Sequence, residues 1–201
     1  MLMNGLRMRK LVYYVATTLD GFIASPDGGD PSGSEFFPIT DDLIKFIVTN
    51  YPETLPAPAR EAMGLSAPGE HFDTVLEGRS SYELGVAAGL SDAYPHLRHL
   101  VFSTTLTSVG PGVELVSERG LERVRELKSE DGKDLWLAGG GTLAHSLLPE
   151  IDRLVLKVNR SIIGSGIPLF NGPFAFHDYQ PTSEVLLDSG VRVLVYDRVS
   201  S

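Results

Sequence analysis

Short apolar segments alternate with amphipathic segments along most of the chain. Apolar runs at residues 11–16, 74–77, 99–103, 113–116, 134–138 and 154–158 are rich in β-branched and aromatic residues. Short runs of this kind, bounded by glycine or polar clusters, predict buried strands. Residues 185–188 and 191–197 predict two further strands, which form a terminal hairpin that turns at Ser189 and Gly190.

Helical spacing of apolar residues predicts helices between these strands. Leu43, Phe46 and Ile47 form one such apolar stripe. The residues expected at the starts of four helices, as caps or first helical residues, are Thr40, Arg79, Ser117 and Thr142. Prolines interrupt residues 52–68, where we expect a loop and a short helix.

The order of elements predicts the fold class. Strands and helices alternate through the middle of the chain, and a hairpin closes it. This order is typical of an α/β fold with a mostly parallel central sheet, helices on both faces and an antiparallel C-terminal hairpin. A length of 201 residues suits one domain, which we place at residues 8–201. Met8 is a second candidate start, so we expect residues 1–7 to be a disordered extension.

Composition and charge exclude several classes of protein. The absence of cysteine excludes a disulfide scaffold, a thiolate nucleophile and a cysteine-ligated zinc site. A net charge of −9 argues against a nucleic-acid partner. No segment reaches the roughly 18–20 apolar residues that cross a bilayer, and none of the five histidines has metal-ligand spacing. We therefore expect a cytoplasmic protein with no nucleic-acid, membrane or metal partner.

Gly139, Gly140 and Gly141 follow a predicted strand and precede a predicted helix. Glycines let the backbone approach a phosphate closely, and the N–H groups at the start of the next helix attract an anion. The triplet is neither the dinucleotide fingerprint GxGxxG nor a Walker motif. By itself it indicates a phosphate site or a tight turn about equally.

Two further loops that follow predicted strands carry phosphate-binding groups. They are Gly78, Arg79, Ser80 and Ser81 after one strand, and Ser103, Thr104 and Thr105 after another. In an open α/β sheet, ligands bind at the carboxyl ends of the strands. A helix cap and a solvated arginine would explain one such loop, but three together favour a ligand with several phosphates.

Five segments, in this order, resemble the dihydrofolate reductase superfamily. They are Asp20-Gly21-Phe22-Ile23-Ala24, Gly78-Arg79-Ser80-Ser81-Tyr82-Glu83, Ser103-Thr104, the glycine triplet, and Gly164-Ser165-Gly166-Ile167-Pro168-Leu169-Phe170. More closely, the chain resembles the reductase (C-terminal) domain of bifunctional riboflavin-biosynthesis deaminase/reductases and its stand-alone bacterial relatives. The resemblance covers residues 8 to about 197. It implies a dihydrofolate-reductase-like fold, NADPH as hydride donor and a homodimer.

The resemblance also implies residue roles toward the cofactor. Gly139, Gly140, Gly141 and Thr142 would line the pyrophosphate and nicotinamide side of NADPH, with a cis peptide bond between Gly139 and Gly140. Arg79, Ser103 and Thr104 would surround the adenosine 2′-phosphate and favour NADPH over NADH. Gly78, Ser80 and Ser81 would contact the pyrophosphate, and Ala16 and Ile23 would border the nicotinamide through backbone atoms.

Asp42 is the candidate catalytic residue. Dihydrofolate reductases place a carboxylate early in the corresponding helix, and the resemblance puts Asp42 at that position. Against an apolar pocket the pKa of such a carboxyl would be raised, which suits an acid. The interpretation that we favour from the sequence is that Asp41 and Asp42 complement the helix dipole, by about 0.3–1 kcal/mol each.

The sequence says less about the substrate than about the cofactor. Folate-binding relatives carry an arginine for the glutamate tail, and the resemblance places Leu97 at that position. Between Ser25 and Phe72 the only basic residues are Lys45 and Arg60, against eight acidic ones, which disfavours a sugar phosphate. We expect a reductase that acts on a small neutral or cationic heterocycle or carbonyl compound beside the loop at residues 27–34. The alternatives are a non-catalytic NADP(H)-binding or sensing module and a dihydrofolate reductase proper.

Three other side chains have structural interpretations. Tyr13 and Tyr14 alternate along the first strand, so we expect one on each face of the sheet. We expect Asp20 to hold the turn before Gly21, and Trp136 to lie in the core.

Overall fold

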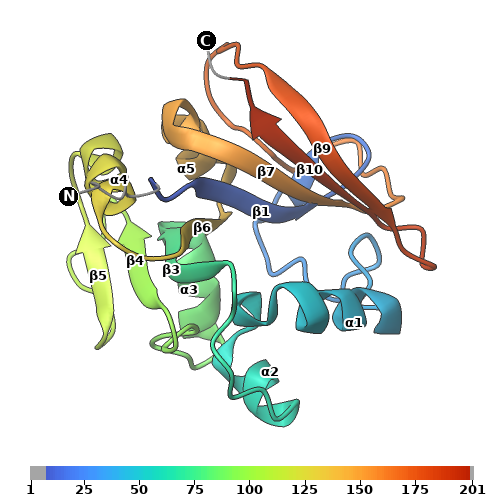
Figure 1. Cartoon of the computed structure of the whole chain (residues 1–201), viewed down its shortest axis with the longest axis horizontal. Coiled ribbons are helices and arrows are strands. Elements are labelled where there is room, and N and C mark those ends of the chain that lie inside the picture. Colours follow the sequence, from blue (N-terminus) through green and yellow to red (C-terminus); the bar gives the residue numbers. More distant parts are fainter. Residues whose placement is uncertain (1–7, 200–201) are drawn as a thin grey trace, which may run out of the picture.

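An eight-stranded sheet forms the centre of the protein (Figure 1). The computed structural model describes residues 8–199, so the extension expected at residues 1–7 lies outside the described part. The strands of this sheet are β1 (Leu11–Thr17), β3 (Phe72–Gly78), β4 (Arg98–Phe102), β5 (Val113–Val116), β6 (Asp134–Gly139), β7 (Ile151–Val158), β9 (Tyr179–Leu186) and β10 (Arg192–Arg198). A separate two-stranded ribbon pairs β2 (Phe22–Ala24) with β8 (Ile167–Pro168).

The strand order is β5-β4-β3-β6-β1-β7-β10-β9. The six strands from β5 to β7 run parallel, and β10 runs antiparallel to both β7 and β9. Non-sequential parallel neighbours need crossover connections, and helices supply most of these. The predicted fold class, a mostly parallel sheet with an antiparallel terminal hairpin, is therefore confirmed.

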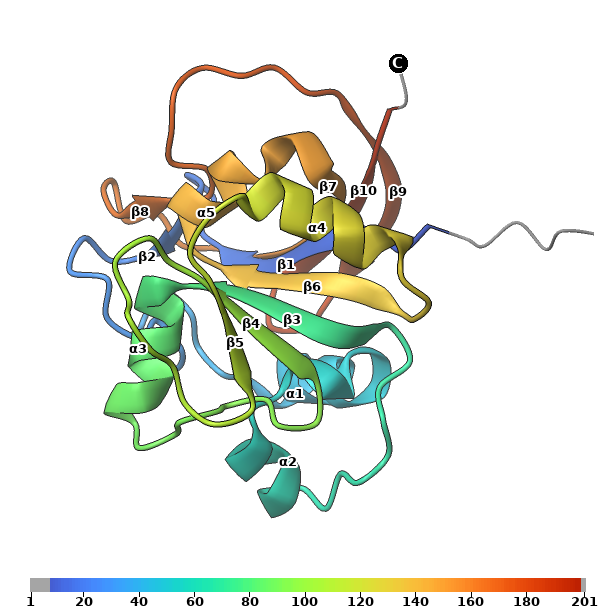
Figure 2. The same ribbon diagram turned by 90° about the vertical axis from the view of Figure 1, so that its left-hand side faces the viewer.

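Helices cover both faces of the sheet (Figure 2). They are α1 (Asp41–Asn50), α2 (Ala57–Ala62), α3 (Arg79–Ala87), α4 (Gly120–Ser129) and α5 (Gly141–Ser146), with short 3₁₀ turns at Pro52–Thr54 and Leu148–Glu150. Helices α4 and α5 lie on one side of the sheet, and α1 and α3 lie on the other. No helix in the described range is both long and apolar enough to span a bilayer.

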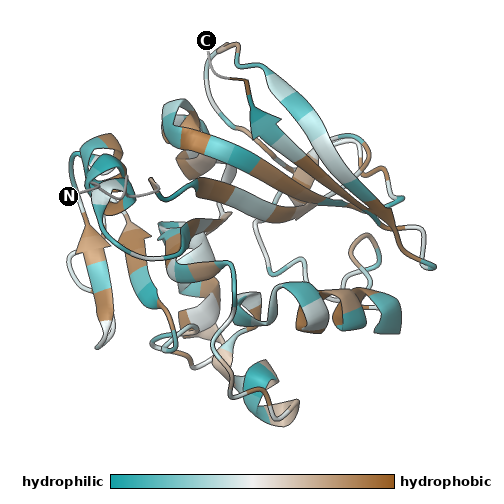
Figure 3. Ribbon diagram, viewed as in Figure 1, coloured by the Kyte–Doolittle hydropathy of each residue, from teal (hydrophilic) through white to brown (hydrophobic). Residues whose placement is uncertain are grey.

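The central strands bury both of their faces, so β1 is a nearly continuous apolar run. Tyr13 belongs to the core cluster beneath α4 and α5, and Tyr14 belongs to the cluster beneath α1. Trp136 is buried in the second cluster, as expected for a core residue. Apolar residues gather on the central strands, whereas α1 and α2 mix polar and apolar residues (Figure 3).

Two predicted helix caps are wrong. The residue before α4 is Arg119, with φ 54°, rather than Ser117, because the chain passes through a left-handed residue before the helix begins. The residue before α5 is Gly140, with φ 93°, so Thr142 lies inside the helix. Thr40 does precede α1, but its hydroxyl donates to Asp42 Oδ1 rather than capping a backbone N–H. A cap assignment depends on backbone angles, which the residue type only biases.

Candidate functional site

Three strand ends bring the predicted phosphate-binding loops together. In the strand register, Gly78 of β3 lies beside Phe102 of β4, and Glu77 lies beside Gly139 of β6. The loops that follow these strands therefore leave the same edge of the sheet next to one another. This carboxyl edge is where open α/β sheets bind ligands.

The first loop leads into α3 at Gly78. No side chain caps the amino end of this helix, so its first N–H groups face outward without a side-chain acceptor. The Arg79 side chain is 51% exposed, and the carboxylate paired with it is Glu83, at a long 4.0 Å. An uncapped helix end beside an exposed guanidinium favours an anion.

The second loop is the glycine turn between β6 and α5. Gly140 supplies the turn with φ 93° and ψ 102°, a conformation that a residue with a Cβ rarely adopts. The Gly139–Gly140 peptide bond is trans, so the cis bond implied by the resemblance is not present. A Cβ on Gly139 would stand 3.4 Å from Ser81 Oγ, which places this turn directly beside the start of α3.

The segment after β8 closes over the glycine turn. The Asn171 N–H donates to the Gly141 carbonyl at 2.9 Å, and the Asn171 amide donates to Thr142 Oγ1 at 3.2 Å. A Cβ on Gly141 would collide with the Pro168 carbonyl. Gly141 and Thr142 are therefore held by protein contacts, while Gly139 and Gly140 form the turn itself.

The third loop begins with Ser103 after β4. The Ser103 hydroxyl accepts the N–H groups of Thr105 at 3.2 Å and Leu106 at 3.0 Å, which orders the loop. Thr104 is exposed at the tip. The Ser103 hydroxyl also lies 3.3 Å from Thr105 Oγ1, so the hydroxyl that the loop presents most openly is that of Thr104.

Ala16 and Ile23 lie at the end of β1 and in the β2 ribbon. Ala16 is half-buried, whereas the Ile23 side chain is buried in the cluster beneath α4 and α5. Asp20 holds the intervening turn, since it accepts the Thr18 hydroxyl at 2.6 Å and the Gly164 N–H at 2.8 Å. The Thr18 hydrogen bond and those from the Ile163 and Gly164 backbone lower the pKa of Asp20. The motif at residues 164–170 therefore helps to hold this turn in place.

Asp42 does not have the raised pKa that an acid role would need. Its carboxylate accepts the Thr40 hydroxyl, the Ser189 N–H at 2.7 Å and the Leu43 N–H at 2.9 Å. These hydrogen bonds, led by the one from Thr40, lower the pKa of Asp42 to about 2. An ionised carboxylate has no proton to give at neutral pH, so the expectation of a raised pKa is wrong.

Lys157 is a charged residue that the sequence analysis overlooked. It lies in β7, and its Nζ sits 3.4 Å from the centroid of the Tyr14 ring. The side chain is half-buried, and the loss of solvent around the amine lowers the pKa of Lys157 to about 7. The sequence does contain a signal for it, because a lysine interrupts the otherwise apolar run 154–158. This run forms a strand that lies between two others in the sheet.

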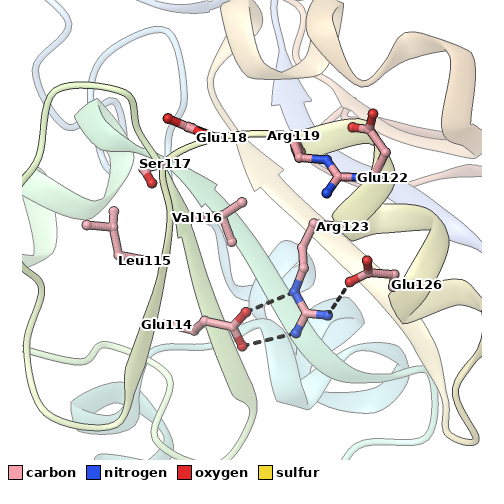
Figure 4. A pocket seen from close by; sticks show the side chains of 9 residues that line it. All are labelled: Glu114, Leu115, Val116, Ser117, Glu118, Arg119, Glu122, Arg123 and Glu126. Carbon is pink, nitrogen blue, oxygen red and sulfur yellow. Dashed lines mark hydrogen bonds and ion pairs between the residues drawn. The ribbon is translucent and has the colours of Figure 1, made fainter.

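Two grooves mark the surface. One, of about 310 Å³, lies between α1 and the turn of the β9–β10 hairpin, and its walls include Asp42 and Leu187. The other, of about 290 Å³, lies between β5 and α4 (Figure 4). There, Glu114 and Glu126 both pair with Arg123. We assign no role to this second groove.

The fold of the chain is the dihydrofolate-reductase-like fold. Within it, the chain belongs to the same family as the uncharacterized protein YwjB of Bacillus subtilis strain 168. The two are 31% identical over 166 residues, which cover 81% of this chain and 83% of YwjB. The uncharacterized protein YyaP of the same organism is 25% identical over 206 residues, covering 96% of this chain and 97% of YyaP. No protein-family model matches the chain.

Solved structures share the fold at low identity. A protein from Shewanella sp. PV-4 assigned to riboflavin biosynthesis has a TM-score of 0.67 and 18% identity, covering 95% of this chain and 99% of that one. Dihydrofolate reductase from Enterococcus faecalis, complexed with NADP(H) and RAB-propyl, has a TM-score of 0.63 and 14% identity, covering 95% and 97%. A deaminase/reductase from Thermotoga maritima has a TM-score of 0.59 and 16% identity, covering 96% of this chain and 57% of that one.

Proposed function

We propose that this protein is an NADPH-dependent reductase that transfers hydride to a small substrate. The observation that carries the proposal is the meeting of three loops with phosphate-binding residue types at one edge of a parallel sheet. The structural neighbours named above include a reductase that holds NADP(H). NADPH, when bound, would supply the hydride, and the chain would supply binding and orientation.

The residues at this edge fit a dinucleotide phosphate. The uncapped start of α3, with Gly78, Ser80 and Ser81, would receive the pyrophosphate together with the Gly139–Gly140 turn. Arg79, with Ser103 and Thr104 from the adjacent loop, would receive the 2′-phosphate. In this arrangement Gly141 and Thr142 anchor the turn, and backbone atoms of Ala16 and Ile23 border the nicotinamide.

The substrate proposed is a small heterocycle or carbonyl compound without a strongly anionic tail. Arg60, one of two basic residues between Ser25 and Phe72, is buried and donates to the Pro52 and Ala67 carbonyls. Leu97 packs in the core cluster beneath α1. Its neighbour Arg98 pairs with Glu114 and Glu130. With Arg60 and Arg98 engaged in these contacts, the other basic residue of the segment is the exposed Lys45. This leaves little positive charge for a sugar phosphate or a folate tail, which disfavours a dihydrofolate reductase proper.

A calorimetric titration with NADPH and NADH tests the cofactor site. We expect wild-type protein to bind NADPH more tightly than NADH. Arg79→Ala should weaken NADPH binding about 10- to 100-fold, since a charge-assisted hydrogen bond contributes roughly 1.5–3 kcal/mol, and should leave NADH binding nearly unchanged. Arg192→Ala is the matched control, because Arg192 is a similarly exposed arginine that pairs with Glu184 on the distant hairpin.

The same preparation separates an enzyme from a sensor module. Loss of nicotinamide absorbance with a panel of cyclic imines and activated ketones would identify turnover. Tight NADPH binding with no turnover of any compound favours the non-catalytic module. No binding of either nucleotide would refute the proposed function.

A further inference from the structure

Lys157 occupies a defined place on the sheet face that packs against α1. In the register of β7, Lys157 lies opposite Ala16 of β1 on one side and Val193 of β10 on the other. Val155 and Val193 both belong to the cluster beneath α1, so Lys157 projects on the same face. Ala16 is the residue proposed to border the nicotinamide, which brings Lys157 beside the proposed hydride-transfer position.

The Lys157 amine has no carboxylate partner in the described part of the chain. Its neighbour is the face of the Tyr14 ring, 3.4 Å from Nζ to centroid. An aromatic face favours the charged amine, whereas burial favours the neutral one. Burial is the cause of the lowered pKa, about 7, so both forms are populated at neutral pH.

The groups that surround Lys157 on this face are mostly uncharged. Strand β10 presents Val193 and Val195 to the cluster beneath α1, and α1 with the residue that follows it presents Phe46 and Tyr51. The titratable groups are the Tyr14 and Tyr51 phenols, with ring centroids 4.7 Å apart, whose pKa values burial raises. The charged groups that act on these phenols are Glu53, which raises both pKa values, and Arg153, which lowers that of Tyr51. Asp42, at the start of α1, is engaged by Thr40 and Ser189.

Tyr14 supplies a second, independent observation. Its side chain is only 3% exposed, and its hydroxyl makes no hydrogen bond of good geometry among the described residues, although the Thr54 hydroxyl lies beside it and acts to lower its pKa against the effect of burial. Buried hydroxyls are nearly always paired, and an orphan calls for an explanation such as a ligand. The Tyr14 ring therefore lies directly beneath the unpaired amine, and its hydroxyl, with Thr54 beside it, keeps hydrogen-bonding capacity for a substrate.

We infer that Lys157 is the proton donor of the proposed reduction and that the Tyr14 hydroxyl binds the same substrate, whose reducible bond is a polar C=N or C=O. This inference rests on the proposed function. The substrate carbon gains the hydride and forms a C–H bond, and the π electrons of the double bond move to its nitrogen or oxygen. That atom takes a proton from Lys157 Nζ. The neutral amine then recovers a proton from water, so the reaction consumes one hydride and one proton.

The lysine also refines the charge argument made from the sequence. Counting basic residues between Ser25 and Phe72 finds little to hold an anion. Lys157 comes to this face from a strand far along the chain, and its environment keeps it from being a fixed positive charge. It is better suited to delivering a proton to an uncharged group than to binding a phosphate.

Variants of Lys157 test the donor role with two probes. The probes are 7,8-dihydrobiopterin, which has a cyclic C=N bond, and isatin, an activated ketone. In the wild type we expect kcat to be constant at low pH and to fall about tenfold per pH unit above neutrality. Lys157→Met should lower kcat about 10²- to 10⁴-fold and remove this pH dependence. Lys157→Arg should also be inactive, because a guanidinium does not release its proton. Tyr14→Phe should raise KM more than it lowers kcat.

Calorimetry on the same variants separates the two proposals. NADPH affinity of Lys157→Met should stay within about twofold of wild type, which also shows that the variant folds. An unchanged kcat and pH profile in Lys157→Met would overturn the donor role alone. Absence of NADPH binding in the wild type would overturn the proposed function and this inference with it.

Competitive acetylation decides the case in which the wild type binds NADPH but reduces neither probe. Trace acetic anhydride, with Nα-acetyl-lysine as internal reference, reports the fraction of neutral Lys157 amine at each pH by peptide mass spectrometry. A reactivity that rises through neutral pH, and that 7,8-dihydrobiopterin suppresses when NADPH is present, supports the inference. Reactivity that rises only with that of the reference compound, or that is indifferent to the probe, refutes it.

Discussion

At the scale of single residues, the environment decides which group can move a proton. Asp42 accepts hydrogen bonds from Thr40 and from the turn of the terminal hairpin, so its carboxylate is ionised well below neutral pH. Lys157 has no charged partner, and burial brings its pKa to about 7. Asp42, the candidate acid for which the sequence favoured a helix-dipole role, thus links α1 to the hairpin, and the proposed proton donor is Lys157.

The first prediction follows from this role of Asp42. Because the pKa of Asp42 is lowered from 3.8 to about 2, its stabilising effect is complete above about pH 4 and is lost as the pH falls toward 2. Asp42→Asn should therefore lower the free energy of urea unfolding at pH 6, and the difference from wild type should shrink at pH 2.5. Exchange of the Ser189 amide should quicken in the variant, while NADPH affinity and the pH profile of turnover stay unchanged.

Asp41→Asn is the control for this variant. Asp41 also lies in the first turn of α1, so it shares the interaction with the helix dipole. It should leave Ser189 exchange as it is in the wild type. If Asp42→Asn abolished turnover while NADPH still bound, Asp42 would be a catalytic residue after all.

At the scale of elements, the glycine turn between β6 and α5 has one structural role and one proposed role in binding the cofactor. Gly141 is required by the fold, because the Pro168 carbonyl occupies the place of a Cβ. Gly139 has room for a Cβ at 3.4 Å from Ser81 Oγ, so the packing of the protein alone does not require glycine there. The space between Gly139 and Ser81 is what the proposed pyrophosphate would use.

The second prediction compares alanine at these two positions. Gly141→Ala should lower the free energy of unfolding by about 1–3 kcal/mol, the usual cost of overpacking. Gly139→Ala should cost less than about 1 kcal/mol, but it should weaken NADPH binding at least tenfold, a loss of about 1.4 kcal/mol. Denaturant unfolding and calorimetry measure the two effects. Equal NADPH affinity in Gly139→Ala and wild type would mean that no phosphate approaches this turn.

At the scale of the whole molecule, a buried network of ionisable side chains links β3 and β4, two of the strands that end at the loops proposed to bind phosphate. His99 of β4 is buried, and its ring nitrogens lie 3.2 Å from Glu77 Oε2 and 2.8 Å from Asp92 Oδ1. Burial by itself would lower the pKa of His99, but hydrogen bonds and charge attraction from the two carboxylates outweigh it, so the pKa is raised. The homodimer implied by the resemblance stays a prediction at this scale.

The third prediction is a pH dependence of global stability. A raised histidine pKa contributes stability that is complete below the ordinary value near 6.5 and is lost as the pH rises through the raised value. The unfolding free energy of wild type minus that of His99→Gln should therefore fall between pH 6 and pH 9, by at most about 1.4 kcal/mol per pH unit. His71→Gln, at an exposed histidine outside the network, should show no such trend. A difference that grew with pH would mean that His99 is neutral in the folded protein.

Much of the fold was predictable because burial leaves a local pattern. The six parallel strands were each found from an apolar run, and Val113–Val116 agrees at both ends. Strand β9 was found only in part, since it begins at Tyr179 rather than at residue 185. Its residues are mostly exposed at the edge of the sheet, where no apolar pattern is required. The short pairing of β2 with β8 was missed because it depends on chain segments far apart in sequence.

The sequence by itself determined the class of fold and the three loops that carry phosphate-binding residue types after strands, because burial period and loop composition are properties of neighbouring residues. Only the tertiary structure decided which ionisable groups are charged. Asp42 meets Ser189, and Lys157 meets Tyr14, across more than a hundred residues of chain. The pKa of a side chain depends on solvation and on partners a few ångströms away. Those distances exist only once the sheet has formed.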